Sequence, residues 1–200
     1  MKKLVSIAIF FLIVLKGSVC FAGPFGFEYG MSKLDIIKVV GKGAIVEEDG
    51  DTLILSTAPK PHSAFEKYIC VISPQKGLLK VVAIGKDIET SGSGSEIKSA
   101  FSDLRKALIG SYGDPSNDFD FLESGSIWNE YQDWMMGLLK HERTLASYWQ
   151  LTAQPDKHIS VIALKAVSSS RDQGYLTIGY EFVGFDQYAD EMKSKKDKVL

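Results

Sequence analysis

Three consecutive residues, His141, Glu142 and Arg143, carry side chains that could do acid–base chemistry or bind a ligand. They lie in a tryptophan-rich stretch from Ile127 to Leu151, which the spacing of its apolar residues predicts to be one long helix. Adjacent residues on a helix point about 100° apart, so three in a row do not converge on one atom unaided. Our first interpretation is therefore that His141 and Glu142 lie at the edge of this helix. The second is that His141, Glu142 and Arg143 form a catalytic or ligand-binding pool.

Neither a metal site nor a cofactor is predicted. The run after His141 lacks the second histidine of the zinc-protease motif H-E-x-x-H. The acidic segment 114–125 fails the calcium-loop pattern, because Leu122 stands where an oxygen ligand is needed. We predict that this segment is a solvated loop. The sequence also has no glycine-rich phosphate loop, no G-x-S-x-G motif and no Cys/His pairing with zinc spacing.

The predicted central helix would anchor the core, because it contains all three tryptophans of the chain. Its apolar stripe consists of Tyr131, Trp134, Leu138, Leu145, Trp149 and Thr152. Met135, Met136 and Leu139 lie beside or behind this stripe, where a solvated helix would carry polar residues. These three residues are candidates for a partner-binding surface. The alternative is that a second layer of the same protein covers them.

Residues 1–22 have the features of a secretory signal peptide. Lys2 and Lys3 precede an apolar run from Val5 to Leu15, and cleavage is predicted near Ala22. The alternative is a lipoprotein anchored through Cys20, but the residues before that cysteine do not fit the usual lipid-attachment pattern. We expect a periplasmic or secreted protein with no transmembrane segment in the mature chain.

The composition of the mature chain excludes some functions. Removal of residues 1–22 leaves 178 residues, with 20 basic and 25 acidic side chains and a formal net charge of −5. A mildly acidic chain without a basic stripe argues against nucleic acid as a partner. Cys70 is the one cysteine left, so no internal disulfide can form, and the strand-like run around it predicts a buried, inert thiol.

The rest of the chain predicts an α+β fold with a mostly antiparallel sheet of about six strands and three main helices. Besides the central helix, two helices are expected, from Ser32 to Gly41 and from Glu96 to Tyr112, each ending at a glycine. Predicted strands cover 44–48, 52–56, 65–73, 78–84, 158–167 and 175–185. The proline-rich segment 58–62 is predicted to be an exposed loop, and a solvated helix is expected from Tyr188.

We expect a single domain over 23–200, with two possible lobes at 23–88 and 95–187. The serine- and glycine-rich segment 89–95 would be a flexible link between them. Each half has a helix that ends at glycine and is followed by strands, which suggests a duplicated helix-plus-sheet unit.

Two short stretches give the chain a resemblance to a known family. Gly30-Met31-Ser32 opens an amphipathic helix with a glycine stop, and the second helix ends in Tyr112-Gly113-Asp114-Pro115. These features resemble small bacterial envelope proteins of the SmpA/BamE-like type. The resemblance implies a binding or assembly module. The chain departs from that family in lacking a good lipid-attachment signal and in its tryptophan-rich segment, and no functional residues are carried over.

The leading hypothesis is an exported, non-catalytic module that binds an envelope protein or a small ligand. The alternative is a periplasmic hydrolase with a site near 127–151. Its pool of candidate residues would be His62, Asp118, Asp120, His141, Glu142 and Arg143. No recognisable catalytic motif supports an enzyme, and the sequence does not identify the partner or the oligomeric state.

Overall fold

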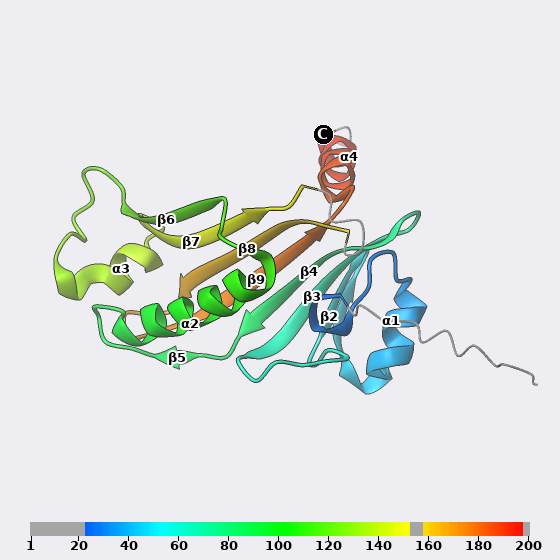
Figure 1. The fold of residues 1–200 in the computed structure, drawn as a ribbon, viewed down its shortest axis with the longest axis horizontal. Helices are drawn as coiled ribbons and strands as arrows, with labels where there is room; N and C mark the ends of the chain where they lie inside the picture. Colours follow the sequence, from blue (N-terminus) through cyan, green and yellow to red (C-terminus); the bar gives the residue numbers. More distant parts are fainter. Residues whose placement is uncertain (1–22, 153–157, 198–200) are drawn as a thin grey trace, which may run out of the picture.

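A single antiparallel β-sheet dominates the structure. The computed structural model describes residues 23–152 and 158–197 (Figure 1). The strands are β1 (Ile45–Asp49), β2 (Thr52–Leu55), β3 (Phe65–Ser73), β4 (Gly77–Gly85), β5 (Ile88–Glu89), β6 (Asn117–Leu122), β7 (Arg143–Gln150), β8 (Ile159–Ser168) and β9 (Gln173–Phe182). The α-helices are α1 (Lys33–Val40), α2 (Ser95–Tyr112), α3 (Trp134–Leu139) and α4 (Phe185–Asp197). Short 3-10 turns cover Pro24–Gly26, Lys42–Ala44 and Tyr131–Asp133.

The sheet consists of two four-stranded meanders that meet at its centre. The strand order is β1-β2-β3-β4-β9-β8-β7-β6, and β5 also pairs with β9. The meanders join where β4 pairs with β9, with Val82 opposite Gly179. The predicted α+β class with an antiparallel sheet is confirmed, but the described residues form nine strands and four α-helices rather than about six and three.

Each meander is preceded by a helix, which agrees with the predicted duplication. Helix α1 ends at Gly41 and α2 ends at Gly113, with φ angles of 84° and 81°. Residues other than glycine rarely adopt this left-handed conformation. In both cases the glycine N–H donates to the carbonyl four residues earlier, and the next strand begins four residues later. The two halves share one sheet, and segment 89–95 between them is hydrogen-bonded through Thr90 and Ser91 to Glu96.

The core lies on one face of the sheet, beneath α1, α2 and α3. Strand β9 alternates strictly, with Leu176, Ile178, Tyr180 and Phe182 buried between half-buried neighbours. Figure 1 shows α2 lying across this sheet. Isoleucines of α1 and α2 are fully buried in the same hydrophobic cluster, so both helices pack on the same face.

The predicted long helix over 127–151 is wrong. Helix covers Trp134–Leu139, the chain reverses at His141 with a φ of 59°, and Arg143–Gln150 forms strand β7. The apolar spacing of this stretch fits a helix, but β6 and β8 supply backbone partners on both sides of β7. These non-local hydrogen bonds outweigh local periodicity. Trp149 is nonetheless a core residue, 1% exposed, and its indole N–H donates to the Gly113 carbonyl at 2.8 Å.

The predicted solvated loop over 114–125 is also wrong in part. Residues Asn117–Leu122 form the edge strand β6, which pairs with β7. The local signal was the alternation Asp118-Phe119-Asp120-Phe121, which has the two-residue period of a strand. The two aspartates point to the helix side, where they pair with Arg105 and Arg143.

Most of the other predicted elements are confirmed. Ser32 and Asp35 form the reciprocal capping box at the start of α1, and 58–62 lies outside the strands. Cys70 is fully buried, and burial raises the pKa of its thiol to about 12. The C-terminal helix begins earlier than predicted, at Phe185. It is also anchored rather than fully solvated, because Tyr188 is buried and its hydroxyl donates to the Asp51 carboxylate.

Candidate functional site

The three residues of the predicted catalytic pool lie at a tight turn rather than along a helix. His141 is exposed in the left-handed conformation, and the Glu142 N–H donates to the Gly137 carbonyl at 3.0 Å. Arg143 is the first residue of β7, and its side chain is 17% exposed. The structure therefore gives these three residues different environments, and His141 and Arg143 line a common cavity.

The predicted partner surface is not a single exposed patch. Met135 is fully buried and belongs to the core, where its methyl group packs close to Gly174. Met136 and Leu139 are half-buried on the other sides of the short helix α3. Met135 is therefore unavailable to a partner, and the alternative interpretation, cover by the same protein, holds for this residue.

The cavity at Arg143 exists because the sheet opens between β7 and β8. The β7–β8 ladder stops at the pair Ala146–Lys165. Strand β7 nevertheless continues to Arg143 against β6, and β8 continues to Ser168 against β9. The opening has a volume of about 300 Å³. It is lined by Leu138, His141, Arg143, Thr144, Leu145, Ala146, Tyr148, Lys165, Ala166 and Val167. We call it the β7–β8 opening.

The segment between β6 and β7 shapes this opening. Helix α3 packs on both β7 and β8. A Cβ placed on Gly137 would lie 3.3 Å from the Arg143 Cβ and from a methyl of Leu122, so α3 approaches the start of β7 closely. Leu138 of α3 is 6% exposed and forms part of the lining. The helix thus covers the inner end of the opening.

Arg143 has more donor capacity than the protein uses. Its Nη1 lies 3.5 Å from Oδ1 of Asp120, a carboxylate whose side chain is 58% exposed. Its guanidinium carbon lies 5.7 Å from the Trp134 ring centre. The Nε atom is buried and has no hydrogen-bond partner. An unpaired buried donor is costly, and the cost is greater on a charged group.

A second cation lies near the same tryptophan. Nζ of Lys98, on α2, lies 4.3 Å from the Trp134 ring centre and donates to the Ser93 carbonyl at 2.7 Å. Burial lowers the pKa of Lys98, and Arg143 lowers it further while Asp120 raises it. The largely exposed carboxylate of Asp120 thus interacts with both Lys98 and Arg143.

The lining of the opening combines cationic and apolar groups. Lys165 is exposed at its mouth, with Nζ 5.4 Å from the Tyr148 ring centre. The remaining lining is largely apolar, from Leu138, Leu145, Ala166 and Val167. Such an arrangement suits an anionic group attached to an apolar body. The sequence analysis found His141 and Arg143 but missed Lys165 and Tyr148, because no local pattern reveals where a strand ladder stops.

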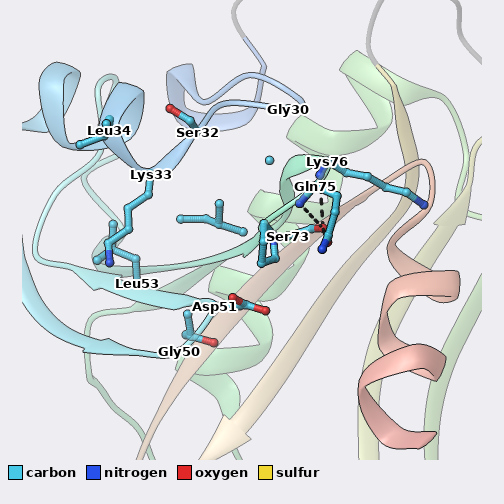
Figure 2. A pocket seen from close by; sticks show the side chains of 14 residues that line it. Gly30, Ser32, Lys33, Leu34, Gly50, Asp51, Leu53, Ser73, Gln75 and Lys76 are labelled. Atoms are coloured by element: carbon cyan, nitrogen blue, oxygen red, sulfur yellow. Dashed lines mark hydrogen bonds between the residues drawn. The ribbon is translucent and has the colours of Figure 1, made fainter. Parts of the chain in front are cut away.

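A larger cleft, of about 520 Å³, lies in the first half of the molecule (Figure 2). It is bounded by the start of α1 and by the β1–β2 and β3–β4 turns. Its charged groups are already occupied, since Lys33 pairs with Glu48 and Asp51 accepts from Tyr188. Lys76 reaches away from the cleft toward α4, where its Nζ donates to Gln187 at 3.0 Å.

The wider hydrolase pool is brought together in part, since Asp120 pairs with Arg143, whereas His62 and Asp118 have other neighbours. His62 lies in the β2–β3 loop of the first half, against Phe65. Asp118 accepts from Arg105 and from Ser147, and the Arg105 guanidinium lowers the pKa of the Asp118 carboxyl. Within 23–152 and 158–197, no group of three or more His, Cys, Asp or Glu residues is placed to hold a metal ion.

Comparison with known proteins gave no match among protein-family models, curated proteins or solved structures. In the described part of the chain, no helix has the length and apolar character needed to cross a membrane.

Proposed function

We propose that this protein is an exported, non-catalytic binding module that takes a small organic anion in the β7–β8 opening. The observation that carries the proposal is Arg143, a largely buried arginine at a cavity whose Nε has no partner. A ligand carboxylate would accept hydrogen bonds from this guanidinium, and the apolar lining would hold the body of the ligand.

The chemistry of arginine supports a carboxylate ligand. A guanidinium presents paired N–H groups that match the two oxygens of a carboxylate. The protein already uses this geometry once, where Nε and Nη2 of Arg105 both donate to Asp118. Arg143 contacts Asp120 through Nη1 instead, so the edge of its guanidinium formed by Nε and Nη2 has no carboxylate partner. A volume of about 300 Å³ is at the lower end of ligand pockets, which favours a small molecule.

Export is part of the proposal. It rests on the charged start and apolar run of residues 1–22, which lie outside the described residues. We propose cleavage near Ala22 and a periplasmic or secreted mature protein. Mass spectrometry of the protein recovered from the envelope and medium fractions tests this. A mature N-terminus at Gly23 supports export, whereas an intact Met1 in the cytoplasm contradicts it.

Titration calorimetry with hexanoate, benzoate and inorganic phosphate tests the site. We expect the two organic carboxylates to bind more tightly than phosphate, because phosphate has no apolar body. Arg143→Met should weaken carboxylate binding at least about tenfold, as expected when a charged hydrogen bond is lost. Arg105→Met is the matched control and should bind as the parent protein does. The proposal fails if Arg143→Met leaves carboxylate affinity unchanged or if none of these carboxylates binds.

A further inference from the structure

Another cavity, of about 300 Å³, lies beside α2 on the side of the sheet that carries the core. It is found where the end of β4, the short strand β5 and the middle of α2 come together, and α2 packs against β5 (Figure 1). Its lining consists of Ala64, Phe65, Gly85, Lys86, Asp87, Ile88, Ala100, Asp103, Leu104 and Leu176. None of these residues lines the β7–β8 opening or the cleft of Figure 2. We call this cavity the α2–β5 pocket.

The inner surface of the α2–β5 pocket is apolar. Its floor contains Phe65 and Leu176, which are 6% and 3% exposed and belong to the hydrophobic core. Its walls contain four hydrophobic residues that pack against the core but stay partly exposed, namely Ala64, Ile88, Ala100 and Leu104. An apolar ligand in the pocket would remove from water the surface that the fold itself leaves exposed.

Backbone contacts hold the walls of the pocket in place. The Lys86 N–H donates to the Ala64 carbonyl at 2.9 Å, and β5 pairs with β9. A Cβ at Gly85 would lie 2.6 Å from the Leu176 carbonyl oxygen, so β4 and β9 are already in close contact at this end. On the opposite wall, the small side chain of Ala100 leaves the space next to α2 unfilled. Collapse of the pocket would break these contacts, so the pocket is preformed, as ligand sites usually are.

The charged groups at the pocket are of mixed sign. Lys86, Asp87 and Asp103 are all exposed, so they lie at its mouth rather than on its floor. Asp103 also pairs with Lys106 on the next turn of α2, at 3.7 Å. With Lys106 included, basic and acidic groups balance, and no arginine comparable to Arg143 is among the lining residues. The pocket therefore suits an uncharged ligand, in contrast to the β7–β8 opening.

The volume of the pocket indicates the size of its ligand. An apolar cavity of about 150 Å³ accommodates benzene. A volume of about 300 Å³ is therefore sufficient for a molecule of about two aromatic rings. The Phe65 ring at the floor can pack edge-to-face against such a molecule. We propose that the α2–β5 pocket binds a small, uncharged, apolar molecule of this size, independently of the anion proposed for the β7–β8 opening.

Fluorescence titration with prodan, an uncharged two-ring dye whose emission shifts to the blue in apolar surroundings, tests this proposal. We expect saturable binding to the parent protein. Ala100→Phe should weaken binding at least about tenfold, because the larger side chain would occupy the pocket. Ala107→Phe is the matched control and should bind as the parent does, since Ala107 is exposed about two turns further along α2 and outside the lining. A parent protein that does not bind, or unchanged binding by Ala100→Phe, overturns the proposal.

Chemical-shift mapping of the parent protein with prodan keeps the proposal testable if Ala100→Phe does not fold. The largest backbone amide shifts should fall at 85–88 and 100–104, on the two sides of the α2–β5 pocket. Hexanoate should not displace the dye, and Arg143→Met should bind it as the parent does, so the two proposed sites can fail separately. Largest shifts at 143–145 and 166–168, or displacement of the dye by hexanoate, would place the dye in the β7–β8 opening and contradict the proposal.

Discussion

The two halves of the sheet each contain a cavity, and the cavities differ in the state of their charged groups. In the first half, Lys33, Asp51 and Lys76 border the larger cleft, and each has a partner within the protein. In the second half, Arg143 borders the smaller opening, and its Nε has none. The proposed binding site therefore rests on the unpaired donor of Arg143 rather than on cavity size.

The two halves differ in the length of the connection between their first two strands. The turn between β1 and β2 has two residues, whereas 20 residues separate β6 from β7. The longer segment contains α3, which packs on β7 and β8 at the end where their ladder stops. The second half therefore differs from the first in the opening at the end of the β7–β8 ladder and in the largely buried arginine beside it.

The largest effects are expected from two core substitutions, one in each half of the sheet. Trp149 and Leu53 stand at opposite ends of one buried cross-strand row, and each is 1% exposed. Trp149→Ala should lower the free energy of unfolding by about 3–5 kcal/mol, and Leu53→Ala by about 2–5 kcal/mol. We expect the tryptophan to cost more, because its indole also donates to Gly113. Urea unfolding measures both, and a larger loss in Leu53→Ala would contradict a core anchored in the second half.

Asp120→Asn gives an intermediate effect and sharpens the account of Arg143. Asparagine keeps the size of the side chain but removes the charge that competes for the guanidinium. Because the Asp120 side chain is 58% exposed, we expect a gain in carboxylate affinity of about threefold, typical of a screened ion pair. Calorimetry measures this gain. Asp118→Asn is the control, since Asp118 pairs with Arg105 instead. Weaker binding by Asp120→Asn would show that the carboxylate positions Arg143 rather than competing for it.

The smallest expected effect is on the pH dependence of stability, through the carboxylates at the starts of α1 and α2. Hydrogen bonds from Thr90 and Ser91 lower the pKa of Glu96 to about 2, and Ser32 lowers the pKa of Asp35. A carboxyl with a lowered folded-state pKa stabilises the fold above its unfolded-state pKa and loses that contribution as the pH falls. For Glu96 the loss falls between about pH 4.5 and pH 2. Glu96→Gln should flatten the dependence of stability on pH in this range.

Thermal unfolding at several pH values measures that slope. We expect Glu96→Gln to reduce it more than Asp35→Asn does, because Glu96 joins α2 to the segment between the two halves. An unchanged slope in Glu96→Gln would mean that its hydrogen bonds do not persist in solution.

The sequence predicted the first half better than the second. Signals in the first half are local: the capping box at Ser32 and Asp35, the glycine stop at Gly41, and the short turns between β1 and β2 and between β3 and β4. The long helix over 127–151 was wrong because β7 is stabilised by pairing with β6 and β8, which lie outside the stretch itself.

The site could be predicted in part. Arg143 and His141 stood out as candidates, although the helix proposed to carry them is absent. Lys165 and Tyr148 could not be found, because their place at the opening depends on the register of β7 against β8. The resemblance to SmpA/BamE-like envelope proteins stays a prediction.

Chemical-shift mapping of backbone amides during titration with hexanoate tests the central claim most directly. The account predicts that the largest shifts fall at 143–145 and 166–168, on the two sides of the β7–β8 opening, and disappear in Arg143→Met. Largest shifts at 50–53 and 72–77, around the cleft of the first half, would contradict it.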